Sequence, residues 1–514
     1  MDRSPLHHVP LPSLLVGIVL TCLLAVLFRP RRRYPPGPKG LPVIGNIFDM
    51  PRKHAWVENR DIALDYGSDV IHYEVLGTHF VVLNSAASVQ DLLEKRSSVY
   101  SDRHETVMIN ELTGWGRAIP FMQHNDEWRE HRKLIQQDFR PTRASQYNPQ
   151  QTKAVRRLLL SLLDSPHYFE EHLRFMANAT ILDVLYALDV DPDDPLITTV
   201  DEALGALMKI SSSVFIVDIF PVLARLPSWL PGAGFKRQAA RWKTFVEAMF
   251  DQPYARYKES TLTEASRPCF AANLLPTFDA AADSAGREEV FKTLAGTAFV
   301  GTSDTIPATL SAFVLAMTIF PEAQVAAQEE LDKLLDMKRL PEIQDREALP
   351  QVTAIVYEAL RWHPAGPMVL PHRLTTDDEY RGYHLPAGTV VFGNAWAILH
   401  DEHAYPNPEQ FNPARWLTAA GTLRADMPCP TAGFGFGRRI CPGRHFALDV
   451  LWLAIAHVLA VLRVERARDA DGNEVVPQAR FTPWLISTPE PFQCEFRPRF
   501  EGAEILIRSG AASD

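Results

Sequence analysis

The stretch that decides the fold lies near the C-terminus and reads Phe434-Gly435-Phe436-Gly437-Arg438-Arg439-Ile440-Cys441-Pro442-Gly443. It is a glycine-rich turn around one cysteine, and its glycines let the backbone bend and approach another group closely. Arg438 and Arg439 place positive charge beside the sulfur of Cys441, which favours the thiolate form. A thiolate on such a turn is suited to be the axial ligand of a haem iron. The alternative interpretation is a buried structural cysteine.

The turn resembles the haem-binding loop of the cytochrome P-450 family, whose pattern is Phe-x-x-Gly-x-Arg-x-Cys-x-Gly. The five fixed positions are met by Phe434, Gly437, Arg439, Cys441 and Gly443. The resemblance implies that haem b (iron protoporphyrin IX) is the cofactor and that Cys441 is the axial ligand of its iron. It implies that the other four residues bind the haem. It also implies a mainly α fold with a minor β region.

Composition limits the class of protein. The chain has 514 residues, 46% of them hydrophobic and 22% charged, as expected of a globular protein with a large core. The net charge of −10 gives no support to nucleic-acid binding, which would need a basic surface. The five cysteines are widely spaced and include no Cys-x-x-Cys pair, so neither a zinc site nor a redox pair is indicated.

The first forty residues predict a membrane anchor. Residues 9–28 are apolar apart from one serine and one threonine, and as a helix they would rise ~30 Å, about one hydrocarbon thickness. Arginines follow them directly and are expected on the cytosolic side. We therefore expect a short lumenal tail (1–8), a single transmembrane signal-anchor (9–28), a basic and proline-rich hinge (29–42) and a haem-binding catalytic domain (43–514).

A cleaved signal peptide is the alternative for the apolar segment. Its positive charges normally precede the apolar run, and a cleavage site between small residues follows it. Here the charge cluster follows the run and no such site is visible. The prolines of residues 34–42 resemble the hinge of microsomal P-450 enzymes, which implies a single-pass protein of the endoplasmic reticulum membrane with its catalytic domain on the cytosolic side.

Hydrophobic periodicity predicts long helices with a small β region after residue 40. A hairpin is expected over residues 69–83, where two β-rich runs flank Gly77. Several helices are expected to end close to a proline. The expected helices cover residues 151–163, 173–188, 237–250, 288–320, 322–335, 349–362 and 444–464.

A possible ion network precedes the cysteine by about eighty residues. Glu358 and Arg361 are three apart on a helix, so they lie on one face and can pair. Arg415 follows in the segment Phe411–Trp416. By resemblance, these three residues form a buried ion network behind the haem. Ala414 stands where family members often carry an acid, a departure that leaves Arg415 intact.

A polar run interrupts the apolar helix at residues 301–305, Gly-Thr-Ser-Asp-Thr. Its hydroxyls could bond back to carbonyls one turn earlier and bend the helix, which is a purely structural interpretation. Pro307 favours a kink because it has no N–H for the Ser303 carbonyl. The resemblance implies instead that Asp304 and Thr305 are catalytic, with Asp304 relaying protons and Thr305 holding bound oxygen and a water molecule.

Two residues depart from the family pattern in this run. Thr302 stands where glycine is usual, and Ile306 stands where a second hydroxyl is common. Thr302 could constrict the site or orient the substrate. The two departures leave open a same-fold haem enzyme that catalyses rearrangement or dehydration without external electrons. A non-enzymatic haem sensor or carrier is a further alternative, although it would not need Asp304 and Thr305.

Candidate ligands for the haem propionates lie on separate segments. Trp128 and Arg132 are four apart on one helical face and resemble the family's Trp-x-x-x-Arg helix. Arg373 and Arg439 match other positions where family arginines meet these carboxylates. Bidentate pairing of guanidinium with carboxylate explains the residue type.

The resemblance predicts a membrane-anchored haem-thiolate monooxygenase that oxygenates a lipophilic small molecule. Electrons would come from NADPH through a flavoprotein reductase. The metabolic role expected is specialised-metabolite biosynthesis, with terpenoids among the candidates. A positive patch that steers the reductase could be formed by Arg129, Lys133, Arg438 and Arg444. The apolar residues 219–236 could touch the membrane. The substrate pocket could be formed by residues 104–123, 365–370 and 484–487. The identity of the substrate does not follow from the sequence.

Overall fold

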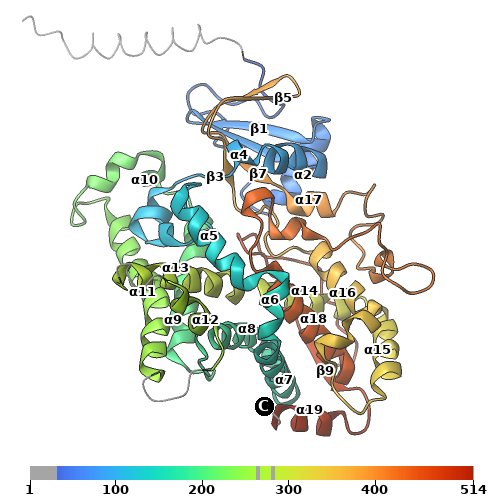
Figure 1. Cartoon of the computed structure of the whole chain (residues 1–514). Coiled ribbons are helices and arrows are strands. Elements are labelled where there is room, and N and C mark those ends of the chain that lie inside the picture. Colours follow the sequence, from blue (N-terminus) through green and yellow to red (C-terminus); the bar gives the residue numbers. More distant parts are fainter. Residues whose placement is uncertain (1–31, 262–266, 279–283, 513–514) are drawn as a thin grey trace, which may run out of the picture.

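The computed structural model describes residues 32–261, 267–278 and 284–512. The predicted tail (1–8), the anchor (9–28) and the first residues of the hinge lie outside these ranges. Figure 1 shows a helical body with a small β region at one end. This arrangement confirms a mainly α fold with a minor β part. The principal helices are α5 (Asp126–Phe139), α7 (Asn148–Asp164), α8 (Phe169–Tyr186), α9 (Pro195–Ser211), α11 (Gly234–Ser260), α13 (Ser284–Ser303), α14 (Thr305–Ile319), α15 (Glu322–Leu335), α16 (Pro350–Trp362), α18 (Arg444–Val461) and α19 (Ala503–Ala512).

The larger sheet has five strands in the order β1-β2-β7-β4-β3. The predicted hairpin is present, because β1 and β2 pair antiparallel around Leu76 and Gly77, whose φ angles of 50° and 83° are both positive. Two such residues are typical of a type I′ turn. The strands are β1 (Val70–Val75), β2 (Thr78–Leu83), β7 (Val390–Gly393), β4 (His372–Arg373) and β3 (Asp102–Arg103).

Two apolar helices, α14 and α18, form the centre of the core. All residues of α14 from Ile306 to Thr318 and all residues of α18 from Val450 to Val461 are buried. The stretch Ala285–Ile319, which joins α13 to α14, and helix α18 are long and apolar enough to pass for membrane spans, but 72% of the most apolar part of each is buried inside the protein. A helix that is apolar on every side and packed in this way is a core helix.

The long helix predicted over residues 288–320 is divided at Asp304 into α13 and α14. The hydroxyl of Ser303 donates to the Phe299 carbonyl at 2.8 Å, and that of Thr305 donates to the Gly301 carbonyl at 2.5 Å. Pro307 has no N–H to donate to the Ser303 carbonyl. Back-bonded hydroxyls and a proline in the same turn therefore interrupt the helix where the polar run lies.

Several helix ends differ from the sequence-based prediction, and two of them have a clear physical reason. Helix α11 continues past residue 250 and through Pro253, which is buried within it. Its packing against α9 outweighs the cost of the proline. Helix α18 ends at Val461 rather than at residue 464, because the chain then enters β8 (Leu462–Arg466), which pairs with β9 (Cys494–Pro498).

The Glu358 carboxylate lies at the centre of a buried polar network. Arg361 Nε and Nη2 donate to its two oxygens at 2.9 and 2.8 Å, and both side chains are fully buried. Arg415 Nε donates to one oxygen at 3.1 Å, and the Trp416 indole donates to the other at 2.9 Å. The Asn412 N–H adds a bond of 2.9 Å. This single carboxylate thus joins α16 to the segment that carries Arg415.

Replacing Glu358 with glutamine should destabilise the protein strongly. Glutamine removes the negative charge and leaves two arginines facing each other without compensation, a change that costs ~3–5 kcal/mol for a buried pair. Thermal or denaturant unfolding of the haem-loaded protein would measure the loss. The matched control is Glu504→Gln, which breaks a solvent-exposed pair with Arg508 and should therefore cost far less. A Glu358→Gln protein as stable as the control would contradict this account of the network.

Candidate active site

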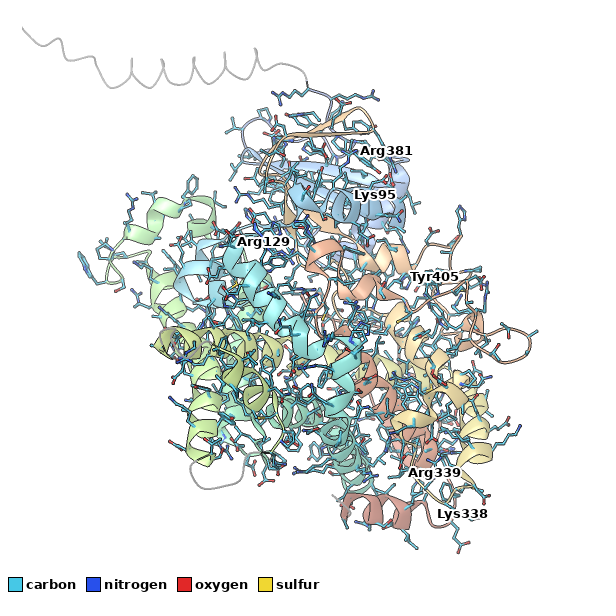
Figure 2. The ribbon with its side chains drawn as sticks, in the orientation of Figure 1. Lys95, Arg129, Lys338, Arg339, Arg381 and Tyr405 are labelled. Carbon is cyan, nitrogen blue, oxygen red and sulfur yellow. The ribbon has the colours of Figure 1, made fainter. Side chains whose placement is uncertain are left out.

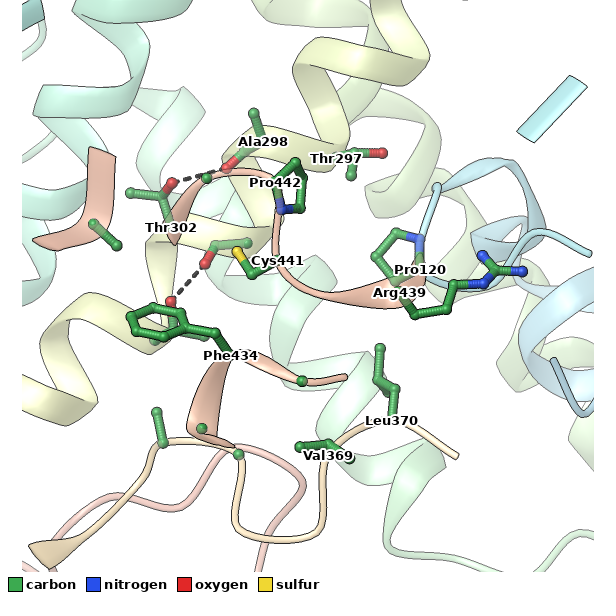
Figure 3. A pocket seen from close by; sticks show the side chains of 18 of the residues that line it. Pro120, Thr297, Ala298, Thr302, Val369, Leu370, Phe434, Arg439, Cys441 and Pro442 are labelled. Atoms are coloured by element: carbon green, nitrogen blue, oxygen red, sulfur yellow. Dashed lines mark hydrogen bonds between the residues drawn. The ribbon is translucent and has the colours of Figure 1, made fainter. Parts of the chain in front are cut away.

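The cysteine turn borders an internal cavity of about 300 Å³ (Figure 3). Cys441 follows the short 3₁₀ turn Gly437–Arg439 and precedes α18, and its N–H donates to the Phe434 carbonyl at 2.8 Å. Phe434, Cys441 and Gly443 all line the cavity. The turn therefore presents its sulfur to an enclosed space, at the start of a core helix.

The three glycines of the turn have different physical roles. Gly437 has φ +54°, and a Cβ there would lie 2.0 Å from the Leu93 carbonyl oxygen, so only glycine fits. Gly435 has φ +84°, but its nearest neighbours are at ordinary contact distance. Gly443 has φ −88°, which any residue adopts, and a Cβ there would lie 4.0 Å from the Cys441 sulfur. Of the three glycines, Gly437 is thus the one that lets the turn approach another group closely, namely the Leu93 carbonyl.

The electrostatics around the thiol differ from the sequence-based expectation. Burial raises the pKa of Cys441, while the Gly443 N–H and the charges of Arg132 and Arg444 act in the opposite direction. Arg438 and Arg439 were expected to have this effect, but neither contributes to the shift. Metal binding itself drives deprotonation of a coordinating thiol.

Five side chains from separate elements form a basic and aromatic cluster at one side of the cavity: Arg103, Trp128, Arg132, His372 and Arg439. Arg132 donates to the Ile440 carbonyl, next to Cys441. Arg439 lies 4.3 Å from the Trp128 ring centre and donates to the Ser101 and Met122 carbonyls at 2.7 and 2.8 Å. Burial and the neighbouring Arg103 lower the pKa of Arg439 to about 8. The cluster is thus crowded with positive charge.

Arg373 lies outside this cluster. In the two-residue pairing of β3 with β4, Arg103 is opposite His372 and Asp102 is opposite Arg373. Successive side chains of a strand point to opposite faces. Arg103 and His372 line the cavity, whereas Arg373 Nη1 lies 3.7 Å from Asp102 Oδ2. His372, and not Arg373, therefore borders the cavity.

Sequence reasoning also missed Arg103. It lies at the end of a short strand with no recognisable spacing to the other arginines, and only the pairing of β3 with β4 brings it to the cavity. Its Nη1 donates to the Leu370 and Pro371 carbonyls at 2.7 Å each. The sequence around it, an acid followed by an arginine, is too common to single out.

The residues present fit a haem. No carboxylate is found among the described residues that line the cavity, and Asp102, outside the lining, offsets only part of the charge of Arg103 and Arg439. The indole N–H of Trp128 is buried without a partner, and such a group normally has one. The two propionates of a haem would supply both the negative charge and the acceptors. The Cys441 sulfur would supply the axial ligand.

The polar residues at the helix break line two different cavities. Thr302 and Thr305 line the cavity that Cys441 borders. Asp304 instead lines a second cavity, of about 270 Å³, together with Glu170, Arg174 and Asp201. Burial raises the pKa of Asp304, and the charge of Arg174 partly opposes that rise. The acid and the alcohol are adjacent in sequence but face different spaces.

Comparison with known proteins agrees with this geometry. The family model for cytochrome P-450 matches residues 35–496. The chain belongs to the cytochrome P-450 family. Its match covers the cysteine turn, the broken helix and the Glu358 network, so the P-450 is a haem protein of the monooxygenase class and an oxidoreductase.

Fungal relatives of this P-450 resemble it over almost their whole length. It is 42% identical to cytochrome P-450 monooxygenase 98 of Postia placenta, over 96% of both chains. It is 40% identical to tryptamine 4-monooxygenase of Psilocybe cyanescens, over 96% of this chain and 98% of the relative. It is 39% identical to a cytochrome P-450 monooxygenase of Armillaria gallica, with the same coverage.

Replacing each glycine of the turn by alanine should destabilise the protein to a different extent. Gly437→Ala should destabilise the P-450 most, because it combines a left-handed backbone, which costs ~1–2 kcal/mol for other residues, with a clash against Leu93. Gly435→Ala should show only the backbone cost, and Gly443→Ala the smallest effect. Thermal unfolding and haem retention after desalting would measure the order. A Gly437→Ala loss no larger than this backbone cost alone would show that the Leu93 contact is unimportant.

Proposed function

We propose that the protein is a membrane-anchored haem-thiolate monooxygenase that inserts oxygen from dioxygen into a lipophilic small molecule. NADPH would supply electrons through a flavoprotein reductase. Specialised-metabolite biosynthesis is the proposed setting, and terpenoids are one candidate substrate class. The observation that carries the proposal is one cavity that Cys441 and Thr305 both line, with Asp304 behind the same helix break.

The haem, when bound, supplies the oxygen chemistry, since an axial thiolate favours cleavage of the oxygen–oxygen bond. Cys441 would hold the iron from one side of the cavity. Trp128, Arg132, Arg439 and the newly located His372 would hold the propionates. Phe434 and Gly443 border the same space and would pack against the ring.

Asp304 and Thr305 would deliver protons. The Thr305 hydroxyl donates to the Gly301 carbonyl, so its oxygen remains able to accept a hydrogen bond from water in the cavity. The raised pKa of Asp304 brings this carboxyl closer to the pH at which it can both take up and release a proton. Its cavity, with Glu170 and Asp201, would be the source of those protons.

The apolar lining favours a lipophilic substrate. Away from the basic cluster, the cavity lining includes Ile119, Val369 and Leu370. The relative from Psilocybe cyanescens is named for an action on tryptamine, and that substrate does not transfer to this chain on identity alone. Rearrangement without external electrons remains the second candidate, because Thr302 and Ile306 border the cavity where the family pattern is broken.

A basic surface on the cysteine side would receive the reductase. Lys133 and Arg438 are exposed, and Arg129 projects from α5 in Figure 2, where it pairs with Asp126 at 2.9 Å. Arg444 is half-buried and donates to the Cys441 carbonyl at 3.4 Å. Complementary charge would speed the encounter with an acidic partner, and salt would slow it.

The hinge and an apolar segment that projects between α9 and α11 would contact the membrane. Ile216, Phe220, Val222 and Trp229 are all more than half exposed there. Exposed aromatic and aliphatic side chains of this kind favour a membrane interface. An anchor at residues 9–28 would hold this projection at the cytosolic face of the endoplasmic reticulum.

The first test is Cys441→Ala. Loss of the thiolate should abolish the absorbance band that reduced, carbon-monoxide-treated haem-thiolate proteins show, even if some haem is retained. The control is Cys429→Ala, at a thiol outside the cavity lining, which should keep the band. A normal band in the Cys441 variant would exclude it as the axial ligand.

The second test is Thr305→Ala in the enzyme reconstituted with a reductase. Loss of the hydroxyl should uncouple the reaction, so that NADPH is consumed at a similar rate but peroxide replaces product. Product and peroxide per NADPH would be measured together. Unchanged coupling would remove Thr305 from the mechanism. Product formed without NADPH would instead favour the rearrangement reaction.

A further inference from the structure

One wall of the cavity carries most of its uncharged polar groups. Thr297, Thr302, Thr305 and Thr309 all come from the broken helix and line the cavity. Thr302 is directly exposed to the same space as Cys441 in Figure 3. The other walls away from the basic cluster are apolar and include Ile119, Pro120, Ala365, Val369, Leu370 and Ile486. A ligand that fits this space would be apolar with one polar edge.

The hydroxyl of Thr302 already donates a hydrogen bond within its own helix. Its Oγ1 donates to the Ala298 carbonyl at 2.9 Å, shown as a dashed line in Figure 3. A hydroxyl has one proton but two acceptor lone pairs. Toward a ligand, Thr302 can therefore act only as a hydrogen-bond acceptor. A ligand group that meets it favourably must carry an O–H or N–H.

The charges around the cavity argue against a charged ligand. No aspartate or glutamate lines it among the described residues, and Asp304 faces the second cavity. An ammonium group would thus be buried beside arginines without a counter-charge, which is costly. A carboxylate would have to compete with the haem propionates for the basic cluster. The space beside Thr302 suits an uncharged molecule.

We propose that the substrate is an uncharged, largely apolar molecule with a hydroxyl or N–H donor, and that Thr302 accepts this hydrogen bond and orients the molecule in the cavity. The inference rests on the proposed function in taking the bound molecule to be the substrate. Thr302 is then a specificity-determining residue. It stands at the position where the sequence departs from its family's glycine.

The test uses the full-length, haem-loaded protein and four probes of similar shape: naphthylethanol, its methyl ether, and the corresponding trimethylammonium and carboxylate compounds. The trimethylammonium group cannot ligate iron, so it reports charge alone. Dissociation constants would come from the change in haem absorbance. The alcohol should bind about three- to tenfold more tightly than the ether, as expected for one hydrogen bond, and both charged probes should bind more weakly than the ether.

Three variants assign the effect to one atom. Thr302→Val keeps the shape but removes the acceptor, so the alcohol should bind only as tightly as the ether while ether binding is unchanged. Thr302→Ser should keep the preference for the alcohol. Thr318→Val is the matched control, because Thr318 makes the same back-bond, to the Val314 carbonyl at 2.9 Å, but does not line the cavity. It should leave all four constants unchanged.

Equal binding of alcohol and ether to the unmodified protein would overturn the inference. So would an equal loss for both probes in Thr302→Val, tighter binding of a charged probe, or no absorbance change with any probe. Donor-selective binding without NADPH-dependent oxidation would overturn the proposed function and leave the binding inference standing. Oxidation without donor selectivity would do the reverse.

Discussion

The buried carboxylate of Glu358 is the interaction on which the rest of the structure depends. It accepts hydrogen bonds from two arginines, an indole and a backbone N–H, and both Glu358 and Arg361 are excluded from water. Arg361 in turn donates to the Leu399 and Gln410 carbonyls at 3.1 and 3.2 Å. A charge removed from water is tolerable only when every partner is in place. The packing of α16 against the chain that leads to the cysteine turn is therefore fixed by this one group.

The cysteine turn depends on that frame and adds a second constraint. Gly437 approaches the Leu93 carbonyl more closely than any side chain would allow, and Arg132 binds the Ile440 carbonyl beside the sulfur. The turn is thereby held by Leu93, outside the cavity lining, and by Arg132, which lines the cavity. A rigid turn would keep the Cys441 sulfur in place as the proposed ligand of a haem iron. The two propionates of a haem would neutralise the positive charge of the neighbouring arginines.

Two adjacent residues at the break in the long helix line different cavities. Thr305 faces the cavity and Asp304 faces a second, more polar space with Glu170 and Asp201. Neighbours on a helix already point about 100° apart, so these two side chains can face different spaces on either side of the break. Thr302 lies one turn earlier and lines the same cavity as Thr305. Its hydroxyl proton is used in the bond to the Ala298 carbonyl, so its oxygen can only accept a hydrogen bond from a ligand. Under our proposals, proton supply and substrate orientation would both come from this irregular segment.

Much of the fold and of the site could be predicted because the necessary signals are local. The spacing of Phe434, Gly437, Arg439, Cys441 and Gly443 pointed to the haem family, and the match of the family model confirms that identification. Helix α15 has the bounds expected from its periodicity, and the pairing of Glu358 with Arg361 followed from their separation by one helical turn. These features depend on residues close together in the chain.

By itself, then, the sequence determined the family, the helical class, the cysteine turn and the polar run in the long helix. Only the tertiary structure decided which faces meet the cavity. It placed His372 and Arg103 inside and Arg373 outside, and it separated Asp304 from Thr305. The reason is that strand alternation and helix rotation say which residues share a face, but not which face is turned to the cavity. That choice depends on contacts with elements hundreds of residues away.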